Sequence, residues 1–229
     1  MLCTPLCNVR VNSAAVMLYF SMGEREFYQP LTKEDRITVV LYRIGIFVST
    51  AVLCAAAVLA VLAFKDPGVL DRRIVYSGFA ADLLLLVLYF SVGLSVFFIH
   101  LYVGKFHRIL KKIYYLAAFC LVVLFFIGKG SPAAVLFGSR PYAALLMVPI
   151  SLCLGFVTAK EAFCFQLIEG YLLAFLMPAF IFFYSVGVLG PRSAVFGLVL
   201  IAALLLLFMS RKVFQPAHYD IGDKSAYQP

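Results

Sequence analysis

Residues 44–64 read IGIFVSTAVLCAAAVLAVLAF, a run of 21 residues without a charged side chain. An α-helix rises about 1.5 Å per residue, so a helix of this length crosses the roughly 30 Å hydrocarbon core of a bilayer. Arg43 precedes the run and Lys65 follows it, which places a charge at each end. The run therefore predicts a transmembrane helix.

Five further uncharged runs follow, at 83–99, 113–128, 141–159, 170–191 and 193–210. Each is close to the roughly 17–25 residues that a spanning helix needs, and residues flanking the shortest run, 113–128, would extend it. We expect an all-α fold, a polytopic transmembrane helical bundle of six spans. The expected parts are an N-terminal tail at 1–43, a membrane domain at 44–210 and a C-terminal tail at 211–229.

The composition of the whole chain agrees with a membrane domain. Hydrophobic residues make up 64% and charged residues 13%, and the mean hydropathy is +1.02. Soluble domains have roughly half their residues apolar and about a quarter charged. The lipid bilayer is thus the expected partner. The net charge of +8 comes from Lys and Arg residues between the apolar runs, a topology signal that argues against nucleic-acid binding.

The six cysteines do not form a recognisable site. No CxxC pair is present, so the sequence gives no support for a zinc or iron–sulfur site. Cys54, Cys120 and Cys153 fall inside apolar runs and are expected to be packed thiols.

The basic residues predict an orientation. With six spans, 13 of the 19 Lys and Arg residues fall in the two tails and the second and fourth connectors, all on one side of the membrane. The positive-inside rule then puts both termini in the cytosol, or in the stroma of a plastid. The first twenty residues contain one Arg and no acid. A cleavable transit-type leader and an ordinary tail both account for that composition.

The second span can begin earlier than residue 83, near Ile74, because only Asp82 interrupts an otherwise apolar stretch. Asp82 is then the one acid within a predicted span. Acids inside a membrane are functional-site hypotheses by default. Asp82 lies eighteen residues before His100, about 27 Å along a helix, so it is expected near the charge-poor interface rather than at mid-membrane. An interface ion pair is the leading interpretation and a proton or ion relay is the alternative. The candidate cations for the ion pair are Lys65, Lys129, Arg140 and Arg192.

His100 and His107 are seven residues apart, and Arg108 directly follows His107. If the second helix ran on past the membrane, both imidazoles would share one helical face. In that arrangement the two histidines would hold a metal, or His100 would ligate a haem or chlorophyll. The alternative, which we favour, is that His100 anchors at the headgroups while His107 and Arg108 join a basic patch.

The connector at 160–169, KEAFCFQLIE, carries two carboxylates and a thiol. Glu161, Cys164 and Glu169 would line one face of a short interfacial helix, with Phe163, Phe165, Leu167 and Ile168 facing lipid. A catalytic Cys164 would need a base such as His100 or His107. A structural elbow, whose acids pair with the basic connector near 105–112, is the favoured interpretation.

Four blocks together resemble an uncharacterised integral membrane protein family of cyanobacteria and plastids. They are Glu34-Asp-Arg with Leu41-Tyr-Arg43, His100-Leu-Tyr with His107-Arg108, Lys160-Glu-Ala-Phe-Cys-Phe with Glu169, and Asp220-Ile-Gly-Asp223-Lys-Ser. The resemblance implies a photosynthetic organism and a thylakoid or envelope membrane of a plastid, or a cyanobacterial membrane. It also gives the blocks at 100–108 and 160–169 added interest. The candidate interaction or structural residues are Asp82, His107, Arg108, Lys160, Glu161, Cys164, Glu169, Asp220 and Asp223.

The leading functional hypothesis is a non-catalytic membrane subunit or assembly factor of a larger complex, plausibly photosynthetic. Its partners would be other membrane-protein subunits, and chlorophyll would be a candidate cofactor. The motivation is that the spans have few central polar residues and that the polar motifs gather on one membrane side. A small transporter or channel is the alternative, and an enzyme ranks third.

Overall fold

The structure is a computed structural model that describes residues 32–65, 78–101, 104–137 and 141–215. Six of its helices are long and apolar enough to cross a membrane. In chain order, the helices are α2 (Lys33–Lys65), α4 (Gly78–Phe98), α5 (Gly104–Ile127), α6 (Pro132–Phe137), the 3-10 helix η1 (Pro141–Met147), α7 (Val148–Phe165), α8 (Ile168–Ser185) and α9 (Pro191–Val213). The described residues contain no strand. The expected all-α bundle of six membrane-spanning helices is confirmed.

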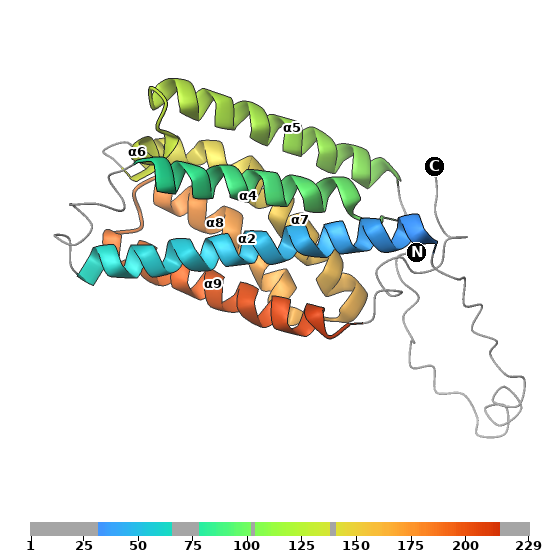
Figure 1. Ribbon diagram of the computed structural model, residues 1–229. Coiled ribbons are helices and arrows are strands. Elements are labelled where there is room, and N and C mark those ends of the chain that lie inside the picture. The colour runs from blue at the N-terminus through green and yellow to red at the C-terminus, as the bar shows by residue number, and fades with distance from the viewer. Residues whose placement is uncertain (1–31, 66–77, 102–103, 138–140, 216–229) are drawn as a thin grey trace, which may run out of the picture.

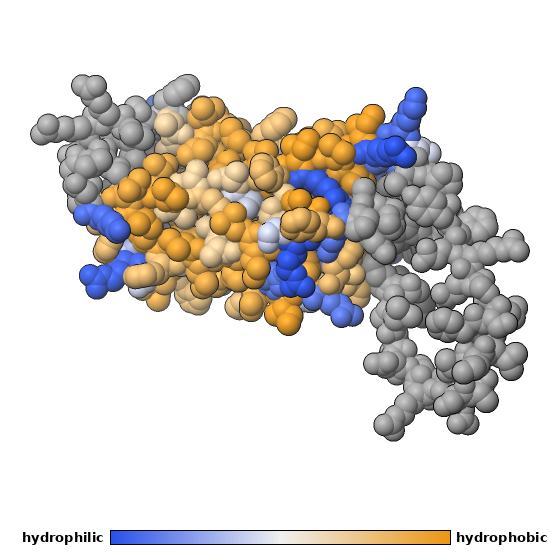
Figure 2. Space-filling model, turned by 60° about the horizontal axis from the view of Figure 1, so that its bottom comes forward, coloured by the Kyte–Doolittle hydropathy of each residue, from blue (hydrophilic) through white to orange (hydrophobic). Residues whose placement is uncertain are grey.

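The long helices lie alongside one another, and successive ones run in opposite directions (Figure 1). We call the end of the bundle where α2 begins and α9 ends the basic end. The turns from α4 to α5 and from α7 to α8 lie at this end as well. Hydrophilic residues gather towards the ends, and the belt between them is mainly apolar (Figure 2).

The expected domain boundaries fall inside helices. α2 begins at Lys33, well before residue 44, and α9 continues past residue 210 to Val213. The early start of α2 has a local cause. The Asp35 backbone N–H donates to the Thr32 hydroxyl (3.2 Å), and the Thr32 backbone N–H donates to the Asp35 carboxylate (2.9 Å). This reciprocal pair is a capping box, which satisfies two N–H groups at the helix start.

Small residues set the closest helix contacts. A Cβ atom on Gly45 of α2 would collide with the Ser91 carbonyl and with Ser95 of α4. On the other side of the bundle, Gly170 of α8 lies against the Thr158 carbonyl and the Ala162 side chain of α7. Glycine lets helix backbones approach closely in a membrane, where dispersion contacts largely drive helix association.

The last two helices are adjacent, as the short Gly190-Pro191-Arg192 hairpin predicts. Gly187 has a positive φ of 80° at the end of α8, a conformation that glycine adopts without steric cost. Pro191 is the first residue of α9, where its missing N–H is not needed by the helix. α8 and α9 are in contact.

Candidate functional site

Glu161 is the most deeply buried charged residue of the bundle, with 0% of its surface exposed. It lies on α7, which continues through Phe165 and does not stop at residue 159 as the hydropathy pattern predicts. The helix ends where Gln166 adopts a left-handed conformation (φ 54°) and donates its N–H to the Ala162 carbonyl. That extra length carries Glu161 inside the packed bundle at its basic end.

Three side chains from three helices hold the Glu161 carboxylate. The Tyr42 hydroxyl on α2 donates to Oε1 at 2.6 Å, and Lys160 on α7 donates to the same oxygen at 2.9 Å. Lys212 on α9 donates to Oε2 and is itself only 1% exposed. We call Tyr42, Lys160, Glu161 and Lys212 the ionic cluster. Both carboxylate oxygens are satisfied, which is the condition under which a buried charge persists.

Aromatic rings complete the surroundings of both ammonium groups. The Lys212 Nζ lies 4.5 Å from the centroid of the Phe165 ring, and the Lys160 Nζ lies 5.4 Å from the centroid of Tyr42. A cation over a ring face is attracted by the ring quadrupole, more strongly where water is excluded. The ionic cluster is therefore packed as well as charge-paired, and it ties the basic ends of α2, α7 and α9 together.

A second ion pair lies nearby. The Arg211 guanidinium of α9 donates to both carboxylate oxygens of Glu169, at 2.8 and 3.1 Å. Glu169 is buried and lies in the first turn of α8, where a carboxylate also interacts favourably with the helix dipole. Arg211 is about half exposed (51%). This pair joins the start of α8 to the end of α9.

The prediction for 160–169 is thus partly corrected. The segment is the last turns of α7 and the first turn of α8, not a separate interfacial helix. Its acids pair with Lys160, Arg211 and Lys212 rather than with the basic residues near 105–112. Phe163 and Ile168 are exposed on the apolar surface as expected, but Leu167 is buried (2%).

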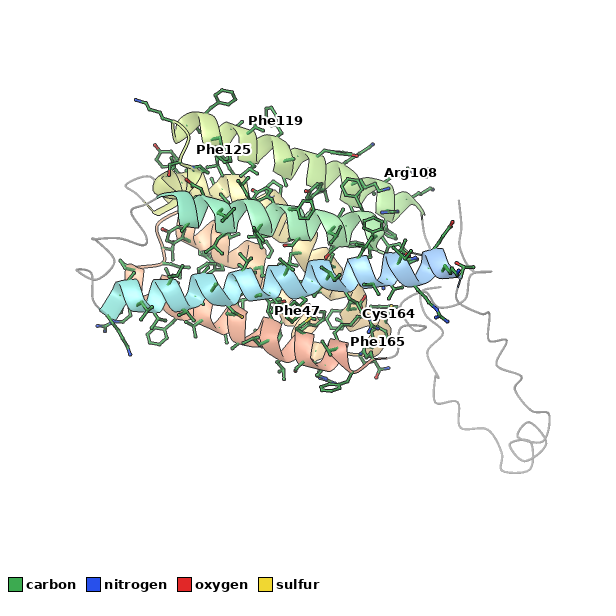
Figure 3. The ribbon with its side chains drawn as sticks, viewed as in Figure 1. Phe47, Arg108, Phe119, Phe125, Cys164 and Phe165 are labelled. Atoms are coloured by element: carbon green, nitrogen blue, oxygen red, sulfur yellow. The ribbon has the colours of Figure 1, made fainter. Side chains whose placement is uncertain are left out.

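Cys164 is a half-buried thiol near the end of α7. Figure 3 shows Cys164 and Phe165 beside α2 and α9, whereas Arg108 lies on α5, at the other side of the bundle's basic end. Arg108 is exposed. The sequence blocks at 100–108 and 160–169 thus lie at the same end of the molecule, as expected. Arg108 does not meet Cys164 or Phe165 there (Figure 3).

His100 and His107 do not share a helical face. α4 ends at Phe98 and α5 begins at Gly104, so the two histidines belong to different elements. The Nε2 of His100 lies 3.3 Å from the Thr38 hydroxyl, and that of His107 lies 3.2 Å from the Val96 carbonyl. Within the described residues, no group of three His, Cys, Asp or Glu side chains is arranged to hold a metal.

Asp82 caps a helix. It is buried near the end of the bundle opposite the basic end, as its sequence position predicts. Its carboxylate accepts hydrogen bonds from the Ser131 hydroxyl (2.9 Å) and from the Ala133 backbone N–H (2.7 Å). Those groups start α6, so Asp82 supplies the acceptor that a helix N-terminus requires. Of the expected cations, Lys65, Lys129 and Arg192 are described and do not pair with Asp82, whose partners are a hydroxyl and a backbone amide. Arg140 lies outside the described residues.

Sequence reasoning missed Tyr42 as a site residue, and with it Arg211 and Lys212. A signal for the two basic residues was present, because they end the last apolar run on the side where Glu161 and Glu169 lie. Two buried acids at one end of a membrane domain need cationic partners at the same depth. Asp220 and Asp223, also singled out, lie outside the described residues.

The comparisons with known proteins identify a family. The model of a family described as "Uncharacterized integral membrane protein (DUF2301)" matches residues 94–228, more than half of the chain. The match includes the blocks around His100, Lys160 and Asp220 but not the one at 34–43. No curated protein and no solved structure matches the chain. The chain therefore belongs to the DUF2301 family of integral membrane proteins.

Proposed function

We propose that the protein is a non-catalytic membrane subunit or assembly factor that packs against a larger membrane complex. The observation that carries the proposal is that the charges of the ionic cluster are paired with one another at one end of the bundle. The middle of the bundle is filled by side chains such as Val92, Ala117 and Leu205, each 0% exposed. A rigid apolar bundle of this kind supports packing against partners better than it supports movement of a solute.

The surface of α5 supports the same proposal. Only 17% of its spanning window is buried within the bundle, the lowest share among the six long helices. Its exposed side includes large rings: Tyr115, Phe119 and Phe126 are 59%, 65% and 80% exposed. Aromatic residues are enriched at protein interfaces because they bury large areas at low entropic cost.

The proposed location is a photosynthetic membrane, the thylakoid or envelope of a plastid or a cyanobacterial membrane. It rests on the sequence resemblance described above. The proposed orientation, with both termini in the stroma or cytosol, rests on the excess of Lys and Arg at the basic end.

Chlorophyll or haem ligation by His100 finds no support in its surroundings. An axial ligand must offer a ring nitrogen to the metal, and Nε2 of His100 already lies at hydrogen-bonding distance from Thr38. His100 also makes a further interaction. We therefore propose no chlorophyll or haem ligand at His100.

Native gels of mildly solubilised membranes test the proposal. We expect the tagged full chain to migrate with a complex much larger than its own 25.4 kDa, and mass spectrometry of the band to return a constant set of membrane proteins. An unrelated six-span protein, tagged and expressed at the same level, is the control. Migration of the chain by itself under conditions that keep other complexes intact would contradict the proposal.

A small transporter is the second candidate, and one observation favours it. Glu161 is a buried carboxylate within a membrane-spanning helix, and such groups line the proton pathways of transporters. Coupled transport would require Glu161 to exchange its partners during the cycle. Solute uptake into liposomes that is lost in Glu161→Gln but kept in Glu169→Gln would support transport and displace the subunit proposal.

A further inference from the structure

A shallow groove follows the surface between α4 and α5. Phe90, Gly93, Leu94, Phe97 and Phe98 of α4 form one side, and Tyr114 of α5 forms the other. It encloses about 440 Å³ and its walls are almost wholly apolar. From Phe90 to Phe98 is eight residues, or about 12 Å along the helix, so the groove runs from the basic end of α4 towards the middle of the bundle.

The absence of a side chain at Gly93 shapes the floor of the groove. A Cβ atom on Gly93 would overlap the Tyr114 hydroxyl and ring. The hydroxyl instead reaches the α4 backbone, where it donates to the Tyr89 carbonyl at 3.0 Å. Tyr114 also packs edge-on against Phe97, with 5.6 Å between the ring centroids. These contacts fix the position of the Tyr114 ring in the groove.

Positive charge lies at the basic end of the same groove. The Lys111 Nζ lies 5.6 Å from the centroid of the Phe97 ring, which is one wall of the groove. Arg108 and Lys112 lie three residues before and one after it on α5, and both are exposed. Positions three and four apart on a helix are neighbours, so Arg108 adjoins both lysines. The groove thus has an apolar body and a cationic mouth at the membrane surface.

We propose that this groove is a binding site for an anionic diacyl phospholipid. One acyl chain lies along Phe90, Leu94 and Phe97, and the phosphate is paired with Lys111, assisted by Arg108 and Lys112. Charge complementarity selects the headgroup, because basic residues beside a spanning helix attract anionic lipids. The acyl chain fits because two residues that line the groove, Phe90 and Phe97, are 72% and 38% exposed on the apolar surface of the bundle.

Lipid binding to the purified full chain in neutral detergent tests the proposal. The probes are phosphatidylglycerol and phosphatidylcholine with identical acyl chains, titrated while the bound lipid is counted by native mass spectrometry. We expect phosphatidylglycerol to bind at least fivefold more tightly, which is about 1 kcal/mol. Equal affinity for the two lipids would overturn the proposal, because the cations would then select nothing.

Two variants and one matched control locate the site. Lys111→Gln should lower the affinity for phosphatidylglycerol about fivefold, and Leu94→Trp, which fills the groove with an apolar side chain, should abolish the tight site. Lys105→Gln removes the same charge from α5 six residues before Lys111, about 120° around the helix at about 100° per residue. It should change the affinity by less than twofold.

Two outcomes separate the groove from general surface attraction. If Lys105→Gln weakened binding as much as Lys111→Gln, or if a well-folded Leu94→Trp bound normally, the site would not be this groove. If Leu94→Trp failed to fold, the Lys111 and Lys105 pair would still decide the question. A photo-crosslinker at Leu94 that captured a polypeptide in native membranes, rather than lipid, would also overturn the proposal.

Discussion

At the scale of single residues, the chain keeps charge inside a membrane bundle by satisfying every oxygen of the carboxylate involved. The Glu161 carboxylate accepts hydrogen bonds from Tyr42, Lys160 and Lys212. The Asp82 carboxylate accepts them from the Ser131 hydroxyl and the Ala133 N–H. Lysine ammonium groups neutralise the charge of Glu161, whereas Asp82 is stabilised only by the dipoles of a hydroxyl and a backbone amide. The two carboxylates should therefore respond differently to amide substitution.

Removing the Glu161 side chain should destabilise the protein strongly. Glu161→Ala leaves buried Lys212 without its carboxylate partner, and breaking a buried ion pair in this way costs about 3–5 kcal/mol. The free energy of unfolding, measured by denaturant titration in detergent micelles, would show the loss. Glu34→Ala, at an exposed position on α2, should have little effect.

A double-mutant cycle checks that the loss comes from the pair. Glu161→Leu combined with Lys212→Met should cost less than the sum of the two single changes, by about 1–3 kcal/mol. Additive effects would mean that the two side chains do not depend on each other.

Asp82 should tolerate an amide but not truncation. Asp82→Asn keeps an oxygen that accepts from Ala133, whereas Asp82→Ala removes the cap of α6 and should cost about 1–2 kcal/mol. The same unfolding titration measures both variants. If Asp82→Asn lost as much stability as Asp82→Ala, a charge partner, rather than helix capping, would account for this residue.

At the scale of helices, glycines decide which pairs lie in close contact. α2 meets α4 at Gly45, where the Ser91 carbonyl and Ser95 leave no room for a Cβ atom. Ser95 also donates its hydroxyl to the Tyr42 carbonyl at 3.4 Å. Because Tyr42 belongs to the ionic cluster, the α2–α4 contact and the ionic cluster position the same segment of α2.

Gly45→Leu should separate α2 from α4 and cost about 1–3 kcal/mol, the range for overpacking. Ala51→Leu is the matched control, because Ala51 lies exposed on the same helix and the added volume faces lipid. Unfolding titrations and size-exclusion profiles of the two variants provide the comparison. Equal stability of the two variants would show that Gly45 does not set the helix spacing.

At the scale of the whole molecule, the six long helices place the start of α2 and the end of α9 at the same end of the bundle (Figure 1). The charges of the ionic cluster and the Glu169–Arg211 pair also lie at that end. The opposite end carries the Asp82 cap and the tight turn between α8 and α9. The two ends of the bundle, which lie at opposite membrane surfaces, are thus chemically different.

Epitope tags at the two termini should share one side of the membrane. In sealed vesicles of one orientation, external protease should remove both tags or neither, since an even number of spans separates them. A tag inserted after Gly187, in the turn before α9, should give the opposite result. Cleavage of only one terminal tag would contradict the six-span topology.

The amino-acid sequence by itself determined the fold class and the number of spans, because uncharged runs of sufficient length have few stable arrangements other than spanning helices. It did not determine where α7 ends or which side chains meet. Glu161 pairs with Lys212, 51 positions away, and Asp82 caps a helix that begins 50 residues later. Hydropathy records only how each residue partitions between water and lipid, whereas these partners depend on how the helices pack. The tertiary structure therefore decided that Glu161 and Glu169 belong to the packed interior and that the two histidines lie on different elements.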